Sequence, residues 1–465
     1  MLVTIVDRSR LPEPGPDPDF HFPVVSRRRL STGMHVWTVE QREVPVLSFL
    51  LMLSSGAASD PADRPGLASL TADLLDEGSG TRSALEIEDA LSRLGAQLET
   101  EVGSDATVLS LLTLSRFKDA ALDLLAEIVC RPRLAAADVD RVRDLRLTRL
   151  MQLRDLAPAV ADRTLIRVLY PDHPYGHLPL GTTRSLQGLR PEEVAAFHAT
   201  MWRPPAVTLV AVGDATHQEM YDAVERAFGS WSPGAATPAH PTVPELPPPP
   251  DRPAARLVIV NRPGAAQSEV RIAQVAVPRQ TPDYHALLVL NAILGGQFVS
   301  RLNMNLREDK GYTYGARSGF EFRRAAGPFA VQAAVQTKVT AAAVREAMKE
   351  IVEIAGCRPA TEQEMSLARS SLTRGYPRGF ETAGQVARGL AQLALFDLPA
   401  ETFEQFIPSI HAVDAAAVTT AAQRLDPDRM TVALVGDRAQ VEPGLAELGL
   451  GEPLVLERTD LDADW

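Results

Sequence analysis

The sequence contains little cysteine, no excess of basic residues and no long apolar run. Two cysteines among 465 residues, Cys130 and Cys357, cannot build a disulfide framework or a cysteine-based metal site. The net charge of −12 argues against a nucleic-acid partner, because phosphate binding depends on clustered lysine and arginine. No stretch approaches the length of a membrane span, and the N-terminus has no signal-peptide pattern. We therefore predict no membrane partner and a cytoplasmic location.

What the chain does have is length for two domains and a clear break between them. Two domains of roughly 200 residues can each bury a core of their own. Residues 232–253 are rich in proline, which lacks a backbone N–H and fixes φ, so this stretch predicts an extended linker. We predict a flexible lead-in over 1–23, an N-terminal domain over 24–231, a C-terminal domain over 254–450 and a tail over 451–465.

The two halves follow one plan. Each begins with a strand-rich stretch and an apolar helix, then offers another strand, a helix that ends in Cys-Arg-Pro, a longer helix, and a last strand that ends in Val-Gly-Asp. The repeated marks, in the same order, predict duplicated α+β domains. In each domain we expect a mostly antiparallel sheet with helices packed on one face. Cys130 and Cys357 fall at equivalent places, so we expect both to pack as small apolar residues.

This duplicated plan resembles the pitrilysin, insulinase and mitochondrial processing peptidase family over roughly residues 24–450. In catalytic members of that family, the first helix carries His-x-x-Glu-His after a Gly-Leu-Ala lead. Two histidines four residues apart share one helix face and can bind one zinc ion, with the glutamate as general base. Here residues 66–68 supply the lead, but Ser69 and Asp73 stand at the two histidine positions and Ala72 at the glutamate position.

The resemblance also places the family's third zinc ligand, a glutamate, at Leu150, and a leucine cannot bind zinc. Ser69 and Asp73 lie one helical turn apart, but two oxygen ligands without a third make a weak metal site. His173 and His177 fall in a segment whose prolines and glycine predict a loop, so they lack the helical spacing of a metal pair. The lone His285 predicts an ordinary core or surface histidine. We therefore expect no metal and no cofactor in this chain.

The strongest local signal lies in residues 294–320, where Leu-Gly-Gly is followed by SRLNMNLREDKGYTYGARSGF. This stretch resembles the family segment with an arginine and a tyrosine seven residues apart, which match Arg307 and Tyr314. The resemblance implies that the pair binds the substrate backbone beside the cleaved bond and stabilises the tetrahedral intermediate. A guanidinium and a phenol suit that role because both can donate hydrogen bonds to developing negative charge.

Other interpretations of the same stretch stay open. Tyr312 is a second tyrosine that could take the place of Tyr314, and Arg307 could simply pair with the acidic residues that follow it. Gly295 and Gly296 fit a tight turn, and they could also give a peptide access to the backbone.

A chain with the arginine–tyrosine pair but without the zinc motif resembles the non-catalytic subunit of a heterodimeric zinc peptidase. The resemblance implies a homologous, zinc-bearing catalytic subunit as partner and an unfolded peptide as substrate. On its own such a chain is not an enzyme, and the zinc belongs to the partner. Two alternatives remain from the sequence: a non-enzymatic scaffold protein of the same fold, and a stand-alone peptidase with an unrecognised metal site.

Overall fold

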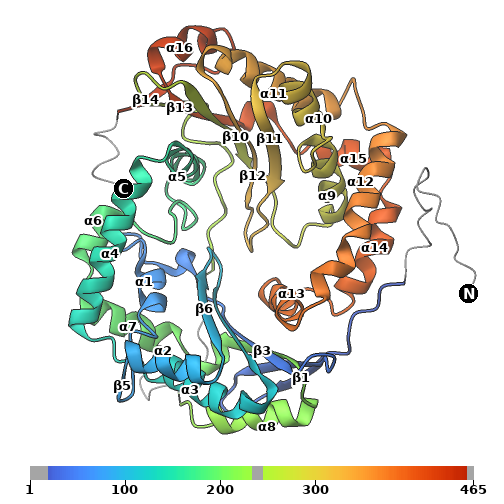
Figure 1. Cartoon of the computed structure of the whole chain (residues 1–465). Helices are drawn as coiled ribbons and strands as arrows, with labels where there is room; N and C mark the ends of the chain where they lie inside the picture. Colours follow the sequence, from blue (N-terminus) through green and yellow to red (C-terminus); the bar gives the residue numbers. More distant parts are fainter. Residues whose placement is uncertain (1–18, 233–244, 458–465) are drawn as a thin grey trace, which may run out of the picture.

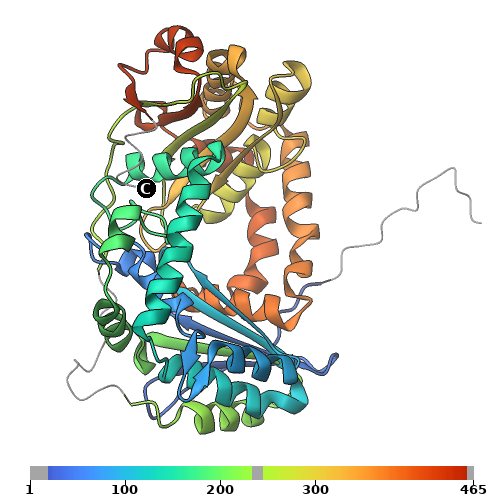
Figure 2. The ribbon, with the colours of Figure 1, turned by 60° about the vertical axis from the view of Figure 1, so that its left-hand side comes forward.

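The computed structural model describes residues 19–232 and 245–457, which form two sheet-and-helix halves (Figure 1). Figures 1 and 2 show one sheet in each half, at opposite ends of the molecule, with helices around and between them. The α+β class predicted from the sequence is confirmed. Within the described ranges, no helix is both long enough and apolar enough to cross a bilayer.

The first half is built on a six-stranded sheet in the order β1-β2-β8-β3-β7-β6. All neighbouring strands are antiparallel except β2 and β8, which are parallel. The strands are β1 (Ser26–Arg29), β2 (His35–Glu40), β3 (Val46–Leu53), β6 (Gln97–Val102), β7 (Thr107–Leu114) and β8 (Val207–Gly213). The main helices are α1 (Leu67–Asp73), α2 (Ala84–Arg93), α3 (Lys118–Cys130), α4 (Ala136–Arg154), α5 (Ala157–Leu169), α6 (Thr183–Gly188), α7 (Pro191–Met201) and α8 (His217–Phe228).

The second half has a sheet of the order β11-β12-β10-β13-β9-β14, in which β13, β9 and β14 run parallel. Five of its strands repeat the topology of the first sheet, but the sixth, β14, comes from the C-terminal end of the chain and is parallel to its neighbour, whereas β1 is antiparallel to β2. Its strands are β9 (Leu257–Asn261), β10 (Gln267–Val275), β11 (Thr313–Phe320), β12 (Pro328–Gln336), β13 (Thr431–Gly436) and β14 (Leu454–Leu456). Its main helices are α9 (Tyr284–Leu294), α11 (Thr340–Ile354), α12 (Glu362–Arg374), α13 (Ala383–Leu395), α14 (Thr402–Ala412), α15 (Ala415–Ala422) and α16 (Arg438–Ala446), with the short α10 at Arg301–Asn303.

Each sheet is covered on both faces, and one cover comes from the opposite half. Along β3, Phe49 and Leu51 pack against α2, α3 and α8, whereas Leu50 and Met52 face α13 of the second half. In return, α5 of the first half packs its apolar side on β10 and β13 of the second sheet. Alternate residues of a strand point to opposite faces, so a strand buried on both faces is almost entirely apolar, as β3 is with Ser48 as its one polar residue. The prediction of helices on one face of each sheet was therefore incomplete.

The structure also differs from the predicted domain limits at both ends. Phe20 and Phe22, in the predicted lead-in, pack against Phe380 and Phe403 with ring centroids 4.5–5.3 Å apart. Strand β14 lies in the predicted tail and joins the second sheet. Most of the predicted linker, and the outer parts of the lead-in and tail, lie outside the described residues.

The two cysteines are not equivalent. Cys130 is the last residue of α3 and packs beside the core of the first half. Cys357 is exposed, because α11 already ends at Ile354. The packing role expected for both cysteines is therefore wrong for Cys357.

Candidate functional site

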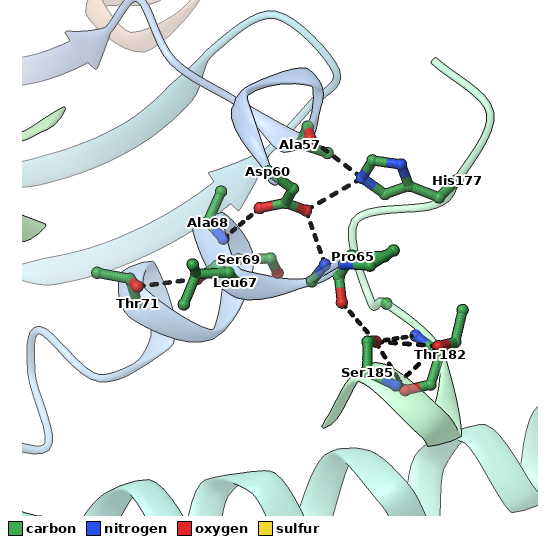
Figure 3. A network of polar contacts seen from close by, with 12 residues as sticks. Ala57, Asp60, Pro65, Leu67, Ala68, Ser69, Thr71, His177, Thr182 and Ser185 are labelled. Carbon is green, nitrogen blue, oxygen red and sulfur yellow. Dashed lines mark hydrogen bonds and ion pairs between the residues drawn. The ribbon is translucent and has the colours of Figure 1, made fainter. Parts of the chain in front are cut away.

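The start of α1, where the family's zinc motif would begin, is fixed by a buried carboxylate. Asp60 accepts hydrogen bonds from the backbone N–H groups of Gly66 and Ala68, both at 2.7 Å (Figure 3). Gly66 has φ of 96°, and a Cβ there would lie 2.8 Å from the Cα of Gly181. The position requires glycine both for its left-handed backbone and for this close approach.

His177 supports the same carboxylate. Its Nε2 lies 3.0 Å from Asp60 Oδ2 and 3.0 Å from the carbonyl oxygen of Ala57 (Figure 3). Both oxygens are acceptors, so Nε2 carries the proton and donates. His173 is also engaged: its Nδ1 accepts from the backbone N–H of Tyr175 at 3.0 Å, which leaves Nε2 to donate to the carbonyl oxygen of Pro247 at 2.9 Å. Both histidines thus hold loops in place.

The helix face that would carry the zinc ligands holds an arginine in place of a metal site. Arg146, from α4, donates from Nη2 to Ser69 Oγ at 2.7 Å and to Asp73 Oδ2 at 2.5 Å. Its Nε also donates to Asp73 Oδ2 at 3.1 Å. The Arg146 guanidinium therefore lies between the two residues that replace the family's histidines, and Arg146 is only 6% exposed.

The remaining positions of the degenerate motif are apolar. Ala72 lies in the core of the first half, and Leu150 is fully buried beside Leu67 and Leu70. Among the described residues, no group of three or more histidine, cysteine, aspartate or glutamate side chains could hold a metal ion. The residues present therefore do not fit zinc, because a guanidinium already engages the two polar side chains.

The sequence motif points to Ser69, Ala72, Asp73 and Leu150 but not to Arg146. The signal was present, because Arg146 precedes Leu150 by four residues and so lies on the same face of α4. A cationic side chain one turn before a lost metal ligand is a candidate to face the same site.

The second candidate site lies in the other half, around Arg307. This residue sits in a π-helical turn, Met304–Asp309, that continues from α10. Such turns are rare and occur often at functional sites. The Arg307 guanidinium lies 4.3 Å from the ring centroid of Phe298, and its Nε is 3.5 Å from Glu308 Oε1. The pairing with an adjacent acid that the sequence left open is present, but the Arg307 side chain stays partly exposed.

Tyr314 lies in a second backbone irregularity. Strand β11 is the outermost strand of its sheet, and its pairing with β12 shifts register between Thr313 and Ala316. The Thr313 hydroxyl donates to Ala334 O at 2.7 Å and accepts from the N–H of Gly315 at 3.1 Å, which holds the bulge. Bulges redirect side chains, and Tyr314 is 92% exposed.

The structure separates the two tyrosines. Tyr312 packs against the core of the second half and donates its backbone N–H to Leu306 O at 2.8 Å. Tyr314 projects into solvent from the bulge. A side chain that must reach a peptide has to be accessible, so the geometry favours Tyr314.

Gly295 and Gly296 form the turn that brings β11 against α9. The carbonyl of Gly295 accepts the N–H of Ser318 at 3.1 Å, and a Cβ on Gly295 would lie 2.5 Å from Ser318 Oγ. A Cβ on Gly296 would lie 2.8 Å from the Asn291 side chain. Close packing therefore explains both glycines, and their suggested contact with a peptide stays a prediction.

Comparisons with known proteins agree with this architecture. The sequence pattern described as Insulinase (Peptidase family M16) matches residues 36–182, and the one described as Peptidase M16 inactive domain matches residues 188–372. The boundary between the two matches precedes β8, which the structure nevertheless places in the first sheet.

Individual relatives cover most of the chain. An uncharacterized zinc protease of Mycobacterium tuberculosis is 27% identical over 416 residues, which span 88% of this chain and 92% of that protein. Mitochondrial-processing peptidase subunit beta of Lentinula edodes is 23% identical over 57% of each chain. The structure of a peptidase M16 inactive domain from Pseudomonas fluorescens superposes with a TM-score of 0.82 at 26% identity, covering 89% of this chain and 98% of that one.

Proposed function

The chain belongs to the M16 peptidases, the pitrilysin and insulinase family, and we propose that it is the non-catalytic subunit of a heterodimeric zinc endopeptidase. In this proposal it supplies Arg307 and Tyr314 to a peptide that is cleaved at the zinc site of a homologous partner. The observation that carries the proposal is a contrast between the halves. The first half fills its zinc-motif face with Arg146, whereas the second half presents Arg307 and Tyr314 from two unusual backbone turns.

The chemistry expected of the pair is hydrogen-bond donation. When the attacked carbonyl of a peptide becomes tetrahedral, its oxygen gains negative charge, and fixed donors lower the barrier most when they are oriented in advance. Stacking on Phe298 orients the Arg307 guanidinium without using its hydrogen-bond donors. The Tyr314 hydroxyl adds a second donor. The zinc of the partner subunit would supply the activated water.

The partner we expect is a chain of similar size that carries His-x-x-Glu-His and the later glutamate. The substrate would be an unfolded peptide that adds a strand to a sheet edge of the catalytic subunit, because backbone pairing gives affinity without strict sequence demands. The names of several relatives, which include zinc proteases and a peptidase subunit, support this reading.

The test is peptide cleavage by this chain mixed with its zinc-bearing partner. Arg307→Ala should lower the cleavage rate by about 10²–10³-fold, the usual cost of removing one such donor. Binding of the two subunits, measured separately, should not change. The matched control is Arg317→Ala on β11, because Arg317 is exposed and, among the described residues, its side chain bonds only to Gln332 across the sheet. Unchanged cleavage with Arg307→Ala would refute the proposal.

Two other outcomes identify the alternatives. If no partner mixture cleaves peptides while the subunits still associate, the chain is a scaffold of the same fold. If the purified chain alone contains stoichiometric zinc and cleaves peptides, it is a stand-alone peptidase with an unrecognised metal site.

A further inference from the structure

A cavity of about 690 Å³ lies between the two halves, away from the Arg307 turn. The first half contributes Leu50 of β3 and the turn between β6 and β7, and the second half contributes α13, α14 and the tip of the β11–β12 hairpin. Its lining is rich in aromatic rings, which are Tyr284, Phe322, Tyr376, Phe380, Phe396, Phe403 and Phe406.

These rings support one another, so the wall is preformed. Tyr376 stacks on Phe406 with centroids 4.0 Å apart, and Phe380 packs against Phe403 at 5.0 Å. Aromatic pairs in such contact hold their positions because each ring restricts its neighbour. A cavity with fixed aromatic walls suits a large apolar group, which fills it without reorganising the protein.

One cation that lines this cavity, Arg279, has no anionic partner among the described residues. The Arg279 guanidinium lies 3.5 Å from the ring centroid of Tyr284 and is partly buried. Within the described part of the chain, its side chain has neither a hydrogen-bond acceptor nor a carboxylate at ion-pair distance, although its backbone N–H bonds to the carbonyl of Arg323. Burial lowers the pKa of Arg279, and the neighbouring groups that oppose this are the phenols of Tyr284 and Tyr376.

Each of the other charged groups around the cavity has a polar partner or is solvated. Arg323 pairs with Glu321 at 2.7 Å, and Arg388 lies 3.4 Å from Glu99. Asp105 accepts from the hydroxyl of Tyr175 at 2.6 Å and from the backbone N–H of Arg324 at 2.9 Å. Glu101 is exposed on the edge strand β6, where water solvates it. Arg279 is therefore the cation that an incoming anion would meet beside the aromatic wall.

We propose that this cavity binds a large apolar group that carries one carboxylate, with the apolar group against the rings and the carboxylate on Arg279. Two sources share that chemistry. One is the C-terminal residue of a peptide with an aromatic or branched side chain, and the other is a free long-chain carboxylic acid. An isolated buried carboxylate is costly unless a cation pairs with it, so Arg279 selects acids over neutral analogues.

The test is calorimetric titration of the isolated full-length chain, without any partner subunit. The probes are a hexapeptide that ends in phenylalanine, the same peptide as its C-terminal amide, and decanoate. We expect the free peptide acid or decanoate to bind, and the acid form of the peptide to bind about tenfold more tightly than its amide. Peptide binding alone identifies a peptide terminus as the ligand, whereas decanoate binding alone identifies a free acid.

Two variants of Arg279 isolate the charge. Arg279→Met keeps an apolar stem over Tyr284 but removes the charge. If the peptide is the ligand, this variant should lose the preference for the acid over the amide; if decanoate is the ligand, it should lose decanoate binding. Arg279→Lys should restore part of that binding because it keeps the cation. Arg317→Met is the control, and should bind like the unaltered chain. The proposal is overturned if no probe binds the unaltered chain, or if Arg279→Met binds acids as tightly as before. These outcomes are independent of peptide cleavage by the heterodimer.

Discussion

Removing the Asp73 carboxylate should destabilise the protein by about 2–3 kcal/mol. Asp73 is the only carboxylate in ion-pair contact with Arg146 among the described residues, and Arg146 is 6% exposed. In Asp73→Ala the guanidinium stays buried with Ser69 as its one remaining partner. A fully buried pair broken in this way costs about 3–5 kcal/mol, and we expect less here because the Asp73 side chain is 45% exposed and admits water.

Replacing the arginine should have a different effect. Arg146→Met removes the charge together with its need for a partner, so the expected change in unfolding free energy is within about 1 kcal/mol. The double variant should recover most of the stability lost in Asp73→Ala. This recovery is the coupling energy that a double-mutant cycle measures.

Urea unfolding followed by circular dichroism gives the four free energies, with Glu77→Ala as the control. Glu77 lies just beyond α1 and pairs with Arg141, whose side chain is 48% exposed, so this pair should contribute less than about 1 kcal/mol. A cost of Asp73→Ala no greater than that of Glu77→Ala, or a double variant as unstable as the sum of the two single changes, would contradict this expectation.

Three further outcomes follow from the structure. Tyr314→Phe should slow peptide cleavage by the proposed heterodimer about 10²-fold, whereas Tyr312→Phe should change it little; the reverse order would assign the donor role to Tyr312. Iodoacetamide should modify exposed Cys357 but not Cys130 in the folded protein, since burial raises the pKa of Cys130 to about 12, and mass spectrometry after digestion locates the label. Burial alone would raise the pKa of Glu364, but hydrogen bonds from Arg301 outweigh it and lower this pKa to about 2. The stability from this pair is therefore fully present above the ordinary glutamate pKa and is lost as the pH falls toward about 2. Acid unfolding of Glu364→Gln should not show this loss.

Much of the fold could be predicted because its signals are local or repeated. The largely apolar run of β3 and the proline-rich break are properties of short segments, and the duplicated order of elements shows in the repeated Cys-Arg-Pro and Val-Gly-Asp marks. The exchange of α5 and α13 between the halves could not be predicted, since an amphipathic helix does not specify which of two similar sheets it will cover.

For the candidate sites, the residues could be predicted from the sequence, but their geometry could not. Ser69, Ala72, Asp73, Arg307 and Tyr314 came from resemblance to short motifs. The π-helical turn that carries Arg307 and the β-bulge that carries Tyr314 depend on contacts with distant strands and helices, which the spacing of the motif does not reveal. The contact between α1 and α4 joins residues more than 70 positions apart in sequence, so the filling of the zinc face became visible only in the folded chain.

The first half, which has the degenerate zinc motif, still has a structural part in the proposed function. The strand that carries Tyr314 ends in a hairpin tip, and that tip is bonded to the first half. Ala325 donates its N–H to the hydroxyl of Tyr175 at 3.1 Å, and Tyr170 donates its hydroxyl to the carbonyl of Ala326 at 2.9 Å. Together with α5 on the second sheet, these bonds fix the far end of β11. A donor must be held rigidly to stabilise a transition state, so in the proposed function the first half would contribute by positioning the strand that carries Tyr314.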